Sequence, residues 1–276
     1  MVTFCEHLHL CLHGGAEIQD HHDRCVCHTL RTVGWYIADN DPFFSCRSQI
    51  QVIVTGSCFT NNTAYRSAGA IYISGNYLEI KDTEFKYNNA TKQTTYDNRT
   101  SAGVFSSEGG NAGAICWMGS YGTVDNGTFI SNNAVVRGGA IQFERNQNGT
   151  VKNSRFKNNT AGEDGGAIDW YKGASNGKII NTNFTDNKAS EDGGAVYIEG
   201  NDCKVYDSNF TSNNAEDEGG AVYVVGNRTY IVNCDFSSSN AKDGASLWVN
   251  GTDCKLYNST FKDNVAEDDG SAIFWE

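Results

Sequence analysis

The stretch AEDEGGAVYVVGN at 215–227 joins three acidic residues, a pair of glycines and a run of strand-forming residues. The same order returns as EDGGAIDW at 163–170, EDGGAVYI at 191–198 and EDDGSAIFW at 267–275. Self-similarity at a fixed interval is the signature of a repeat architecture, in which each unit is stabilised by stacking on its neighbours. The repeat therefore has to be interpreted before a chemical role is assigned to any single residue.

A phenylalanine marks each copy of the repeat. Successive copies lie 25–28 residues apart, except for one step of 44 residues that contains an extra segment at about 91–108. Asparagine follows three positions after seven of the phenylalanines, and alanine follows five positions after all eight. The eight residues are Phe59, Phe85, Phe129, Phe156, Phe184, Phe210, Phe236 and Phe261.

Apolar residues alternate with variable ones after each GGA segment, as in Val222-Tyr223-Val224. A period of two is typical of a strand with one buried face. Asn or Asp usually stands three positions before the phenylalanine, where it suits the left-handed backbone of a corner. Each copy thus offers three short strands and three corners, too few to bury its own apolar face. We predict an all-β, right-handed parallel β-helix of about eight coils of about 26 residues, with equivalent residues stacked on one another.

The first copy starts near residue 49. We therefore predict an irregular N-terminal segment or cap at 1–48 and a β-helix domain at 49–276, with an inserted loop at about 91–108. All six histidines and five of the ten cysteines lie within the first 46 residues. Zn²⁺ prefers these ligands, but their spacing matches no zinc finger, so a zinc cluster and a poorly packed leader both stay open.

Composition excludes several classes of protein. With 33 acidic and 21 basic residues the net charge is −12, which argues against a nucleic-acid binder that follows phosphates. No run of eighteen apolar residues is present, so we predict no transmembrane segment. The first fifteen residues lack the basic start of a signal peptide. We expect either a protein that stays inside the cell or a piece of a longer exported one.

The motifs of the repeat resemble those of two groups of surface proteins. The GGA(I/V) and FxxN motifs are similar to those of the chlamydial polymorphic outer membrane proteins. The fuller pattern N-S-x-F-x-x-N-x-A…GGAI-x-W, with examples at 258–261 and 165–170, more closely resembles the adhesin-like β-helix repeat proteins of methanogenic archaea. The resemblance covers about residues 50–276. It implies an extracellular or cell-surface adhesin that attaches to glycans or proteins of another cell.

The acidic corners have two interpretations. In the first, the acids are solvated residues that keep an edge of the solenoid polar. In the second, carboxylates stacked one coil apart repel each other and would be stabilised by a hard cation such as Ca²⁺, the candidate cofactor. The candidate metal-binding residues are Glu191, Asp192, Glu216, Asp217, Glu267 and Asp268.

Aromatic residues occupy the outward position of the strand after GGA in the last four copies. They are Tyr197, Tyr223, Trp248 and Phe274. Neighbouring rings on adjacent strands pack against one another, and this is one interpretation of the stripe. The other is a flat strip that stacks on sugar rings or on a protein partner.

Many parallel β-helices are polysaccharide-active lyases, hydrolases or epimerases, so catalysis has to be considered. Such a site needs convergent carboxylates with a basic partner. The outward position carries a single acid, Asp169, with Lys172 just beyond it, and every histidine lies outside the coils. We therefore predict a non-enzymatic adhesin-like domain without catalytic residues, and keep a polysaccharide-active enzyme as the alternative.

The sequence stops at SAIFWE, directly after a strand of a new coil. Solenoids need polar caps, because an open end exposes strand edges and apolar side chains. We expect the natural protein to continue with further coils, and this chain to associate end to end or to fray at its last coil.

Overall fold

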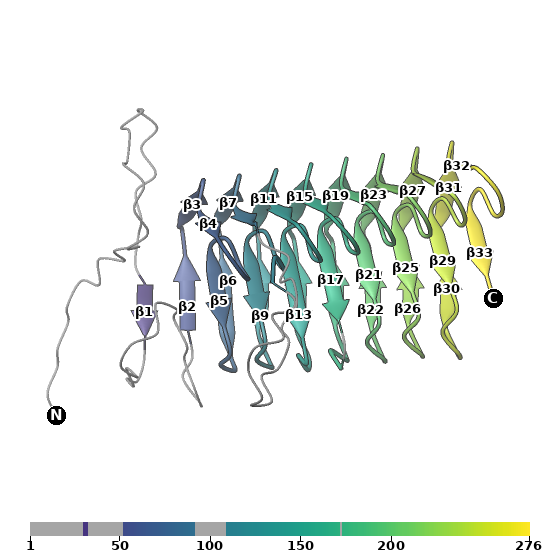
Figure 1. Cartoon of the computed structure of the whole chain (residues 1–276). Coiled ribbons are helices and arrows are strands. Elements are labelled where there is room, and N and C mark those ends of the chain that lie inside the picture. The colour runs from purple at the N-terminus through teal and green to yellow at the C-terminus, as the bar shows by residue number, and fades with distance from the viewer. Residues whose placement is uncertain (1–29, 33–51, 92–108, 172) are drawn as a thin grey trace, which may run out of the picture.

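The computed structural model describes residues 30–32, 52–91, 109–171 and 173–276. In these ranges the regular elements are short β-strands, arranged in four sheets that run along the axis of a solenoid (Figure 1). The chain passes through sheets A, B, C and D in turn and then returns to sheet A one coil further on. The predicted all-β parallel solenoid of about eight coils is confirmed.

Sheets A and B lie on either side of the corner that precedes each phenylalanine. Sheet A comprises β1 (Leu30–Thr32), β2 (Val52–Thr55), β6 (Leu78–Lys81), β10 (Thr123–Asp125), β14 (Thr150–Lys152), β18 (Lys178–Ile180), β22 (Lys204–Tyr206), β26 (Tyr230–Val232) and β30 (Lys255–Tyr257). Sheet B comprises β3 (Cys58–Thr60), β7 (Glu84–Lys86), β11 (Thr128–Ile130), β15 (Arg155–Lys157), β19 (Asn183–Thr185), β23 (Asn209–Thr211), β27 (Asp235–Ser237) and β31 (Thr260–Lys262).

Sheets C and D complete each coil. Sheet C comprises β4 (Thr63–Ala64), β8 (Asn89–Ala90), β12 (Asn133–Ala134), β16 (Thr160–Ala161), β20 (Lys188–Ala189), β24 (Asn214–Ala215), β28 (Asn240–Ala241) and β32 (Val265–Ala266). Sheet D, which follows the glycines, comprises β5 (Ile71–Ile73), β9 (Ile115–Trp117), β13 (Ile141–Glu144), β17 (Ile168–Tyr171), β21 (Val196–Ile198), β25 (Val222–Val224), β29 (Leu247–Val249) and β33 (Ile273–Trp275).

The prediction of three strands and three corners in each coil is wrong, because each coil has four of both. The predicted corner before the phenylalanine is present, with Asn153 and Asp207 both at φ 51°. A second left-handed residue follows two positions after the phenylalanine, such as Asn158 at φ 54° and Ser212 at φ 55°. The chain therefore turns again before the alanine, and the two residues that end on it pair separately as sheet C.

The stacked phenylalanines form the centre of the core. Neighbouring ring centroids are 4.6–5.0 Å apart and the rings are tilted by only 1–11°. Six of the eight, from Phe85 to Phe236, are fully buried. Removing one such side chain from water stabilises the fold by about 1.5–3 kcal/mol, and parallel stacking adds to this.

An asparagine ladder runs beside the phenylalanines and consists of Asn62, Asn88, Asn132, Asn159, Asn187 and Asn213. In the buried Asn159, Oδ1 accepts hydrogen bonds from the backbone N and the Nδ2 of Asn132, at 3.0 and 2.9 Å. Its Nδ2 donates to Phe129 O at 3.1 Å and to Asn187 Oδ1 at 3.0 Å. Each amide therefore satisfies groups on both neighbouring coils, as a buried polar group must.

Two segments of the predicted domain plan lie largely outside the described residues. Of residues 1–48 the structure describes only β1, which pairs antiparallel with β2 at the first end of sheet A. Of the inserted loop at 91–108 it describes Thr91, at the end of the preceding coil. Pairing continues across the insertion, since Ile71 of β5 lies opposite Ile115 of β9.

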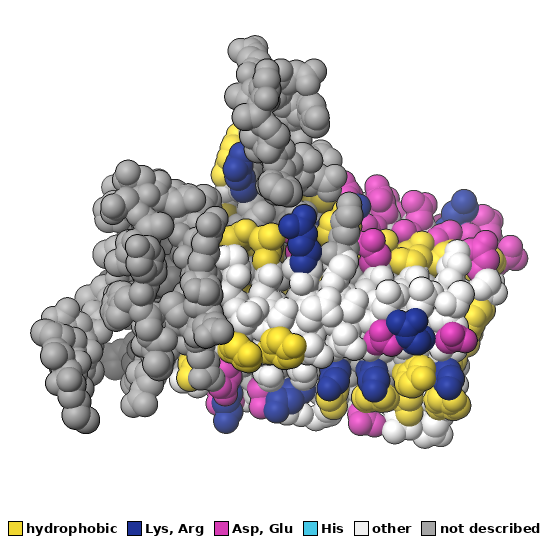
Figure 2. All heavy atoms as spheres, turned by 90° about the horizontal axis from the view of Figure 1, so that it is seen from below, with side chains coloured by type: hydrophobic (Ala, Val, Ile, Leu, Met, Phe, Trp, Pro, Cys, Tyr) yellow, Lys and Arg dark blue, Asp and Glu magenta, His cyan; other side chains and the backbone are white. Residues whose placement is uncertain are grey.

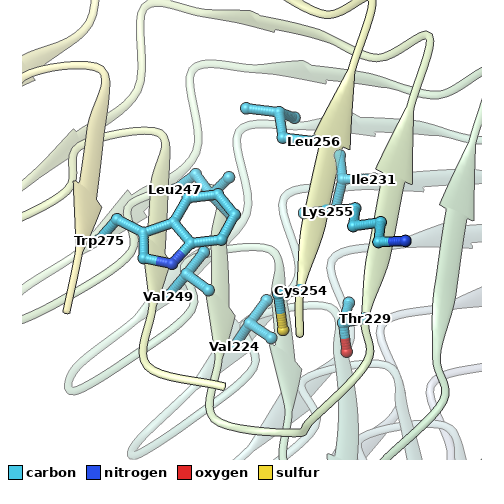
Figure 3. Close-up of a pocket in the computed structure, with 9 residues that line it drawn as sticks. All are labelled: Val224, Thr229, Ile231, Leu247, Val249, Cys254, Lys255, Leu256 and Trp275. Carbon is cyan, nitrogen blue, oxygen red and sulfur yellow. The ribbon is translucent and has the colours of Figure 1, made fainter. Parts of the chain in front are cut away.

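The apolar interior extends to the last coil. Figure 3 shows Trp275 of β33 beside Leu247 and Val249 of β29, while the side chain of Lys255 on β30 extends away from them. Trp275 and Val265 are exposed in this coil. No helix in the described part of the chain could cross a membrane.

Candidate functional site

The predicted aromatic stripe is a continuous stack of rings on the outer side of sheet D. Ring centroids are 5.1 Å apart between Tyr197 and Tyr223, 4.4 Å between Tyr223 and Trp248, and 6.2 Å between Trp248 and Phe274. Tyr223 is only 9% exposed and Trp248 only 5%. The rings pack against one another along the coils, and the middle two offer little surface to a partner.

The corner that enters sheet D covers this stripe. Gly219 has φ +64°, and a Cβ on it would lie 2.7 Å from Val222 O and 3.0 Å from Tyr223 Cα. A Cβ on Gly165 would lie 3.0 Å from the Cβ of Asp169. The corner backbone therefore folds directly over the outward position of the strand in a left-handed conformation that favours glycine, although Ala68 and Ala112 adopt it in two of the coils. A sugar-binding role for the stripe remains a prediction.

The acidic corners form two parallel rows of side chains. The inner acid row stands directly before the glycine and consists of Asp164, Asp192, Glu218, Asp243 and Asp269. The outer acid row stands one residue earlier and consists of Glu163, Glu191, Asp217, Asp268 and, as its one basic member, Lys242. Along the inner row, Asp164, Asp192 and Asp243 each accept a backbone N–H from the next coil, as Asp192 Oδ1 does from Glu218 N at 3.1 Å.

Burial and mutual repulsion make the inner acid row hard to ionise. Burial, followed by the charge of Asp164, raises the pKa of Asp192 to about 7. Burial also raises the pKa of Asp164, although Arg137, whose Nε lies 2.8 Å from its Oδ2, opposes this rise. Burial and the neighbouring Asp243 raise the pKa of Glu218. A shallow surface hollow lies at the middle of the rows, lined by Asp192, Asp217, Glu218, Lys242 and Asp243.

The candidate cation ligands do not align as the sequence suggested. Grouping the acids by the Glu-Asp dipeptide pairs Asp192 with Asp217, but the hydrogen bond above places Asp192 beside Glu218. Glu216 instead pairs with Lys188, at 2.8 Å between Nζ and Oε1, and Asp268 lies 3.9 Å from Lys242 Nζ. The described residues contain no group of three or more His, Cys, Asp or Glu side chains that could hold a metal ion. Ca²⁺ binding by Glu191, Glu267 and the others stays a prediction.

Asp169, the single outward acid, is fully buried. Its Oδ2 accepts a hydrogen bond from Gln142 Nε2 at 3.0 Å, and its Oδ1 has no hydrogen-bond partner. Burial raises its pKa well above the ordinary value, because exclusion of water disfavours the charged form. Arg137 lies above this region, with its guanidinium 4.5 Å from the ring centre of Tyr171. The other residue of the proposed pair, Lys172, lies outside the described residues.

A pair of exposed tyrosines was not among the candidate residues predicted from the sequence. Tyr77 and Tyr121 are 47% and 55% exposed, and their rings stack at 5.6 Å with an 18° tilt. Both have a left-handed backbone, with φ 62° and 58°. They stand eight positions before a phenylalanine, and counting back from each later phenylalanine would have revealed the row. The same row continues as Asn148, Asn176, Asp202, Arg228 and Asp253.

A second surface feature, the lysine–tyrosine strip, covers the outer side of sheet A in the last four coils. It consists of Lys178, Lys204, Tyr230 and Lys255 in one row and Ile180, Tyr206, Val232 and Tyr257 in the next. These are the sixth and fourth positions before each phenylalanine, on either side of the buried fifth position. In Figure 2, basic and hydrophobic side chains alternate along one margin of the C-terminal half, and acidic side chains gather along the opposite margin.

Comparison with known proteins identifies the fold family. The model of a right-handed β-helix region matches residues 28–210, which is more than half of the chain. Neither a curated protein nor a solved structure matches. The match agrees with the parallel register of the four sheets and starts before the predicted domain boundary at 49, close to β1. The chain belongs to the right-handed β-helix family.

Proposed function

We propose that the chain is a non-enzymatic, adhesin-like β-helix module of an exported surface protein, which attaches to glycans or proteins of another cell. The observation that carries this proposal is the exposed pair Tyr77 and Tyr121. The resemblance of the repeat to archaeal adhesin-like proteins and to chlamydial outer membrane proteins supports the cell-surface location. The module would act by presenting side chains on rigid coils, as repeat proteins do.

The two tyrosines have the properties of a binding platform. The left-handed conformation of both residues is the corner geometry that recurs along the coils, and here it carries two bulky side chains. Packing in the core does not account for the two tyrosines, because about half of the surface of each residue is exposed. Parallel rings with an apolar face and a polar hydroxyl suit stacking on a sugar or on a protein side chain.

The backbone beneath the rings is fixed from coil to coil. Tyr77 N donates to Ser120 O at 2.9 Å, and Tyr121 N donates to Gln147 O at 2.8 Å. Asn76 Oδ1 accepts a further hydrogen bond from Ser120 N at 2.7 Å. The platform is therefore organised before a ligand arrives, which lowers the entropic cost of binding.

The alternative, a polysaccharide-active enzyme, needs an acid that the substrate can reach. Asp169 is closed off beneath the corner of Gly165, and the remaining acids of the corners recur in rows along the coils. Repetition of this kind is expected of structure, whereas a catalytic group acts at one place. These observations favour attachment over catalysis.

The test is binding of the full chain to an array of oligosaccharides and to whole cells. The double variant Tyr77→Asn/Tyr121→Asn should bind at least about tenfold more weakly, because stacking surface is lost. Asparagine occupies the same row at 148 and 176, so the fold should be unharmed. The control is Tyr87→Asn, which removes an exposed left-handed tyrosine at another corner and should leave binding unchanged.

Two results would overturn the proposal. One is a wild-type chain that binds neither array nor cells, or a double variant that binds as the wild type does. The other is release of new reducing ends or unsaturated sugars from an acidic polysaccharide, which would establish the enzyme instead.

A further inference from the structure

The positive charge of the lysine–tyrosine strip is carried by its three lysines, which lie in the described part of the chain. Lys178, Lys204 and Lys255 form no ion pair with any described residue. Lys204 and Lys255 instead flank one ring, with their Nζ atoms 5.9 and 5.2 Å from the centre of Tyr230. The nearby Asp202 forms an ion pair with Arg228, whose Nε and Nη2 donate to Oδ1 and Oδ2 of Asp202 at 2.6 and 2.8 Å. In a chain of net charge −12, this is a local surplus of positive charge.

The two acid rows show the opposite surplus on another face. Glu191, Asp217 and Asp268 of the outer row are exposed. Between them lies the hollow lined by four carboxylates and Lys242. Burial first, and then the charges of Asp164, Glu218 and Asp217, raise the pKa of Asp192.

The two surfaces have matching dimensions. The strip covers β18, β22, β26 and β30, and the acid rows stand at the corners of these same coils and of the one before them. Both surfaces repeat once per coil, at the strand spacing of about 4.8 Å. They lie along opposite margins of the C-terminal half (Figure 2), so one molecule can use both at the same time.

We propose that copies of this chain lie side by side, with the lysine–tyrosine strip of one copy against the acid rows of the next. The contact is heterologous, because each copy gives a different face. A heterologous contact that does not close into a ring builds an open row of molecules. This goes beyond attachment to another cell, because it describes how neighbouring copies would pack on one surface.

Several weak contacts add up in this arrangement. A single exposed ion pair contributes little, but three lysines spread over four coils are held here in one rigid frame. Ile180, Tyr206, Val232 and Tyr257 add an apolar and aromatic row beside the lysines. The net charge of the chain opposes approach at low salt, but at 0.15 M ionic strength the Debye length is about 8 Å and repulsion between distant charges is screened. Association should therefore be strongest at intermediate salt.

The experiment is sedimentation velocity of the full chain at 0.15 M and 1 M NaCl. We expect species larger than the monomer at 0.15 M, and at least about tenfold weaker association at 1 M. The strip-reversed variant Lys178→Glu/Lys204→Glu/Lys255→Glu should be monomeric. The control Lys86→Glu/Lys157→Glu/Lys262→Glu makes the same change of charge on sheet B and should associate as the wild type does.

A second variant makes the test specific for the paired faces. The acid-reversed variant Glu191→Lys/Asp217→Lys/Asp268→Lys should also be monomeric alone, because its strip meets a basic row. Mixed with the strip-reversed variant, it should form complexes again, because the reversed strip fits the reversed row. Circular dichroism of each variant reports whether the coils remain folded.

Three results would overturn the proposal. The first is a wild-type chain that stays monomeric at 0.15 M up to several hundred micromolar. The second is association that survives strip reversal and 1 M salt but is lost in Trp275→Ser, which would show end-to-end stacking through the last coil. The third is a failure of the two folded variants to associate when mixed.

Discussion

The asparagine ladder and the inner acid row stand at two corners of the coil and form the same kind of hydrogen bond, but they differ in burial and in charge. In the asparagine ladder, a side-chain oxygen accepts a backbone N–H from the neighbouring coil, at 3.0 Å between Asn132 N and Asn159 Oδ1. In the inner acid row, Asp192 Oδ1 accepts from Glu218 N at 3.1 Å. The first row is buried and uncharged, whereas the second stands at a surface hollow and resists ionisation.

The difference comes from one functional group. An amide has a donor as well as an acceptor, so Asn159 also satisfies Phe129 O and the next amide in the row. An ionised carboxylate only accepts, so each added coil brings another negative charge beside the last. A row of amides can therefore close inside the core, and a row of carboxylates needs water, a cation or a basic partner.

Exchanging the two groups in the interior should have the largest effect. Asn159→Asp places a carboxylate beside Phe129 O and Asn187 Oδ1, which are both acceptors. We expect a loss of about 5 kcal/mol, or no folding at neutral pH, because a buried charge lacks a partner. Urea titration measures this loss. Asn158→Asp, exposed at the adjacent corner, is the control and should cost less than about 1 kcal/mol.

The comparison also assumes that the stacked phenylalanines hold the asparagine ladder in register. Phe184→Ala should cost about 3–5 kcal/mol, because the coils on either side cannot collapse into the cavity. Phe261→Ala, in the half-buried last coil, should cost clearly less. A loss below about 1 kcal/mol for Phe184→Ala in the same titration would contradict the assignment of this ladder to the core.

The charged row should make stability depend on pH. Because the pKa of Asp192 is about 7 in the folded chain and near 3.8 ordinarily, the folded state binds more protons between these values. The free energy of unfolding should therefore fall as pH rises from about 4 to 7. In Asp192→Asn the decrease in the free energy of unfolding between these pH values should be smaller by roughly 1–2 kcal/mol, a figure that allows for solvent screening.

Thermal unfolding at pH 5 and pH 8 measures the effect. The exposed Asp186→Asn serves as the control and should leave the pH profile as it is. A wild-type melting temperature that rises between pH 5 and pH 8 would contradict the assignment of a raised pKa to Asp192.

The smallest effect should come from repairing the asparagine ladder. Ser239 occupies the next position after Asn213, and its backbone N donates to Asn264 Oδ1 at 3.0 Å. Ser239→Asn would offer an oxygen to Asn213 and a donor to Asn264, and should stabilise the chain by about 1 kcal/mol. Ser238→Asn, exposed beside it, should be neutral. A destabilised Ser239→Asn would mean that this coil has no room for the amide.

Most of the fold could be predicted because the residues that build it recur in every coil. The phenylalanines, the asparagines and the corner before each phenylalanine all lie where their spacing placed them. The fourth strand was missed because left-handed corners do not require asparagine or aspartate. At the second corner the residue varies and includes Tyr87, Ser131 and Ser212 alongside Asn158.

The candidate sites were harder to predict, because they depend on what folds over a strand. Alternation shows that Tyr223 and Trp248 leave the core, but not that the glycine corner then covers them. The acids were misaligned because they were grouped by the Glu-Asp dipeptide, which starts two positions after the alanine at Glu191 but one position after it at Glu216 and Glu267. The lysine–tyrosine strip and the exposed tyrosines follow the phenylalanine spacing but carry no repeated residue type, so no motif marks them.

The coil-to-coil pairing of the asparagine ladder has a consequence for how such a gene can change. From Asn88 to Asn187 every amide of the ladder bonds to the coil before it and to the coil after it, and both present the same groups. An in-frame duplication of one repeat therefore inserts a coil whose donors and acceptors are met on both sides. The outward positions bear no such constraint and are free to diverge after copying. Selection can therefore add coils and substitute the outward residues of one face, while the interior residues stay the same.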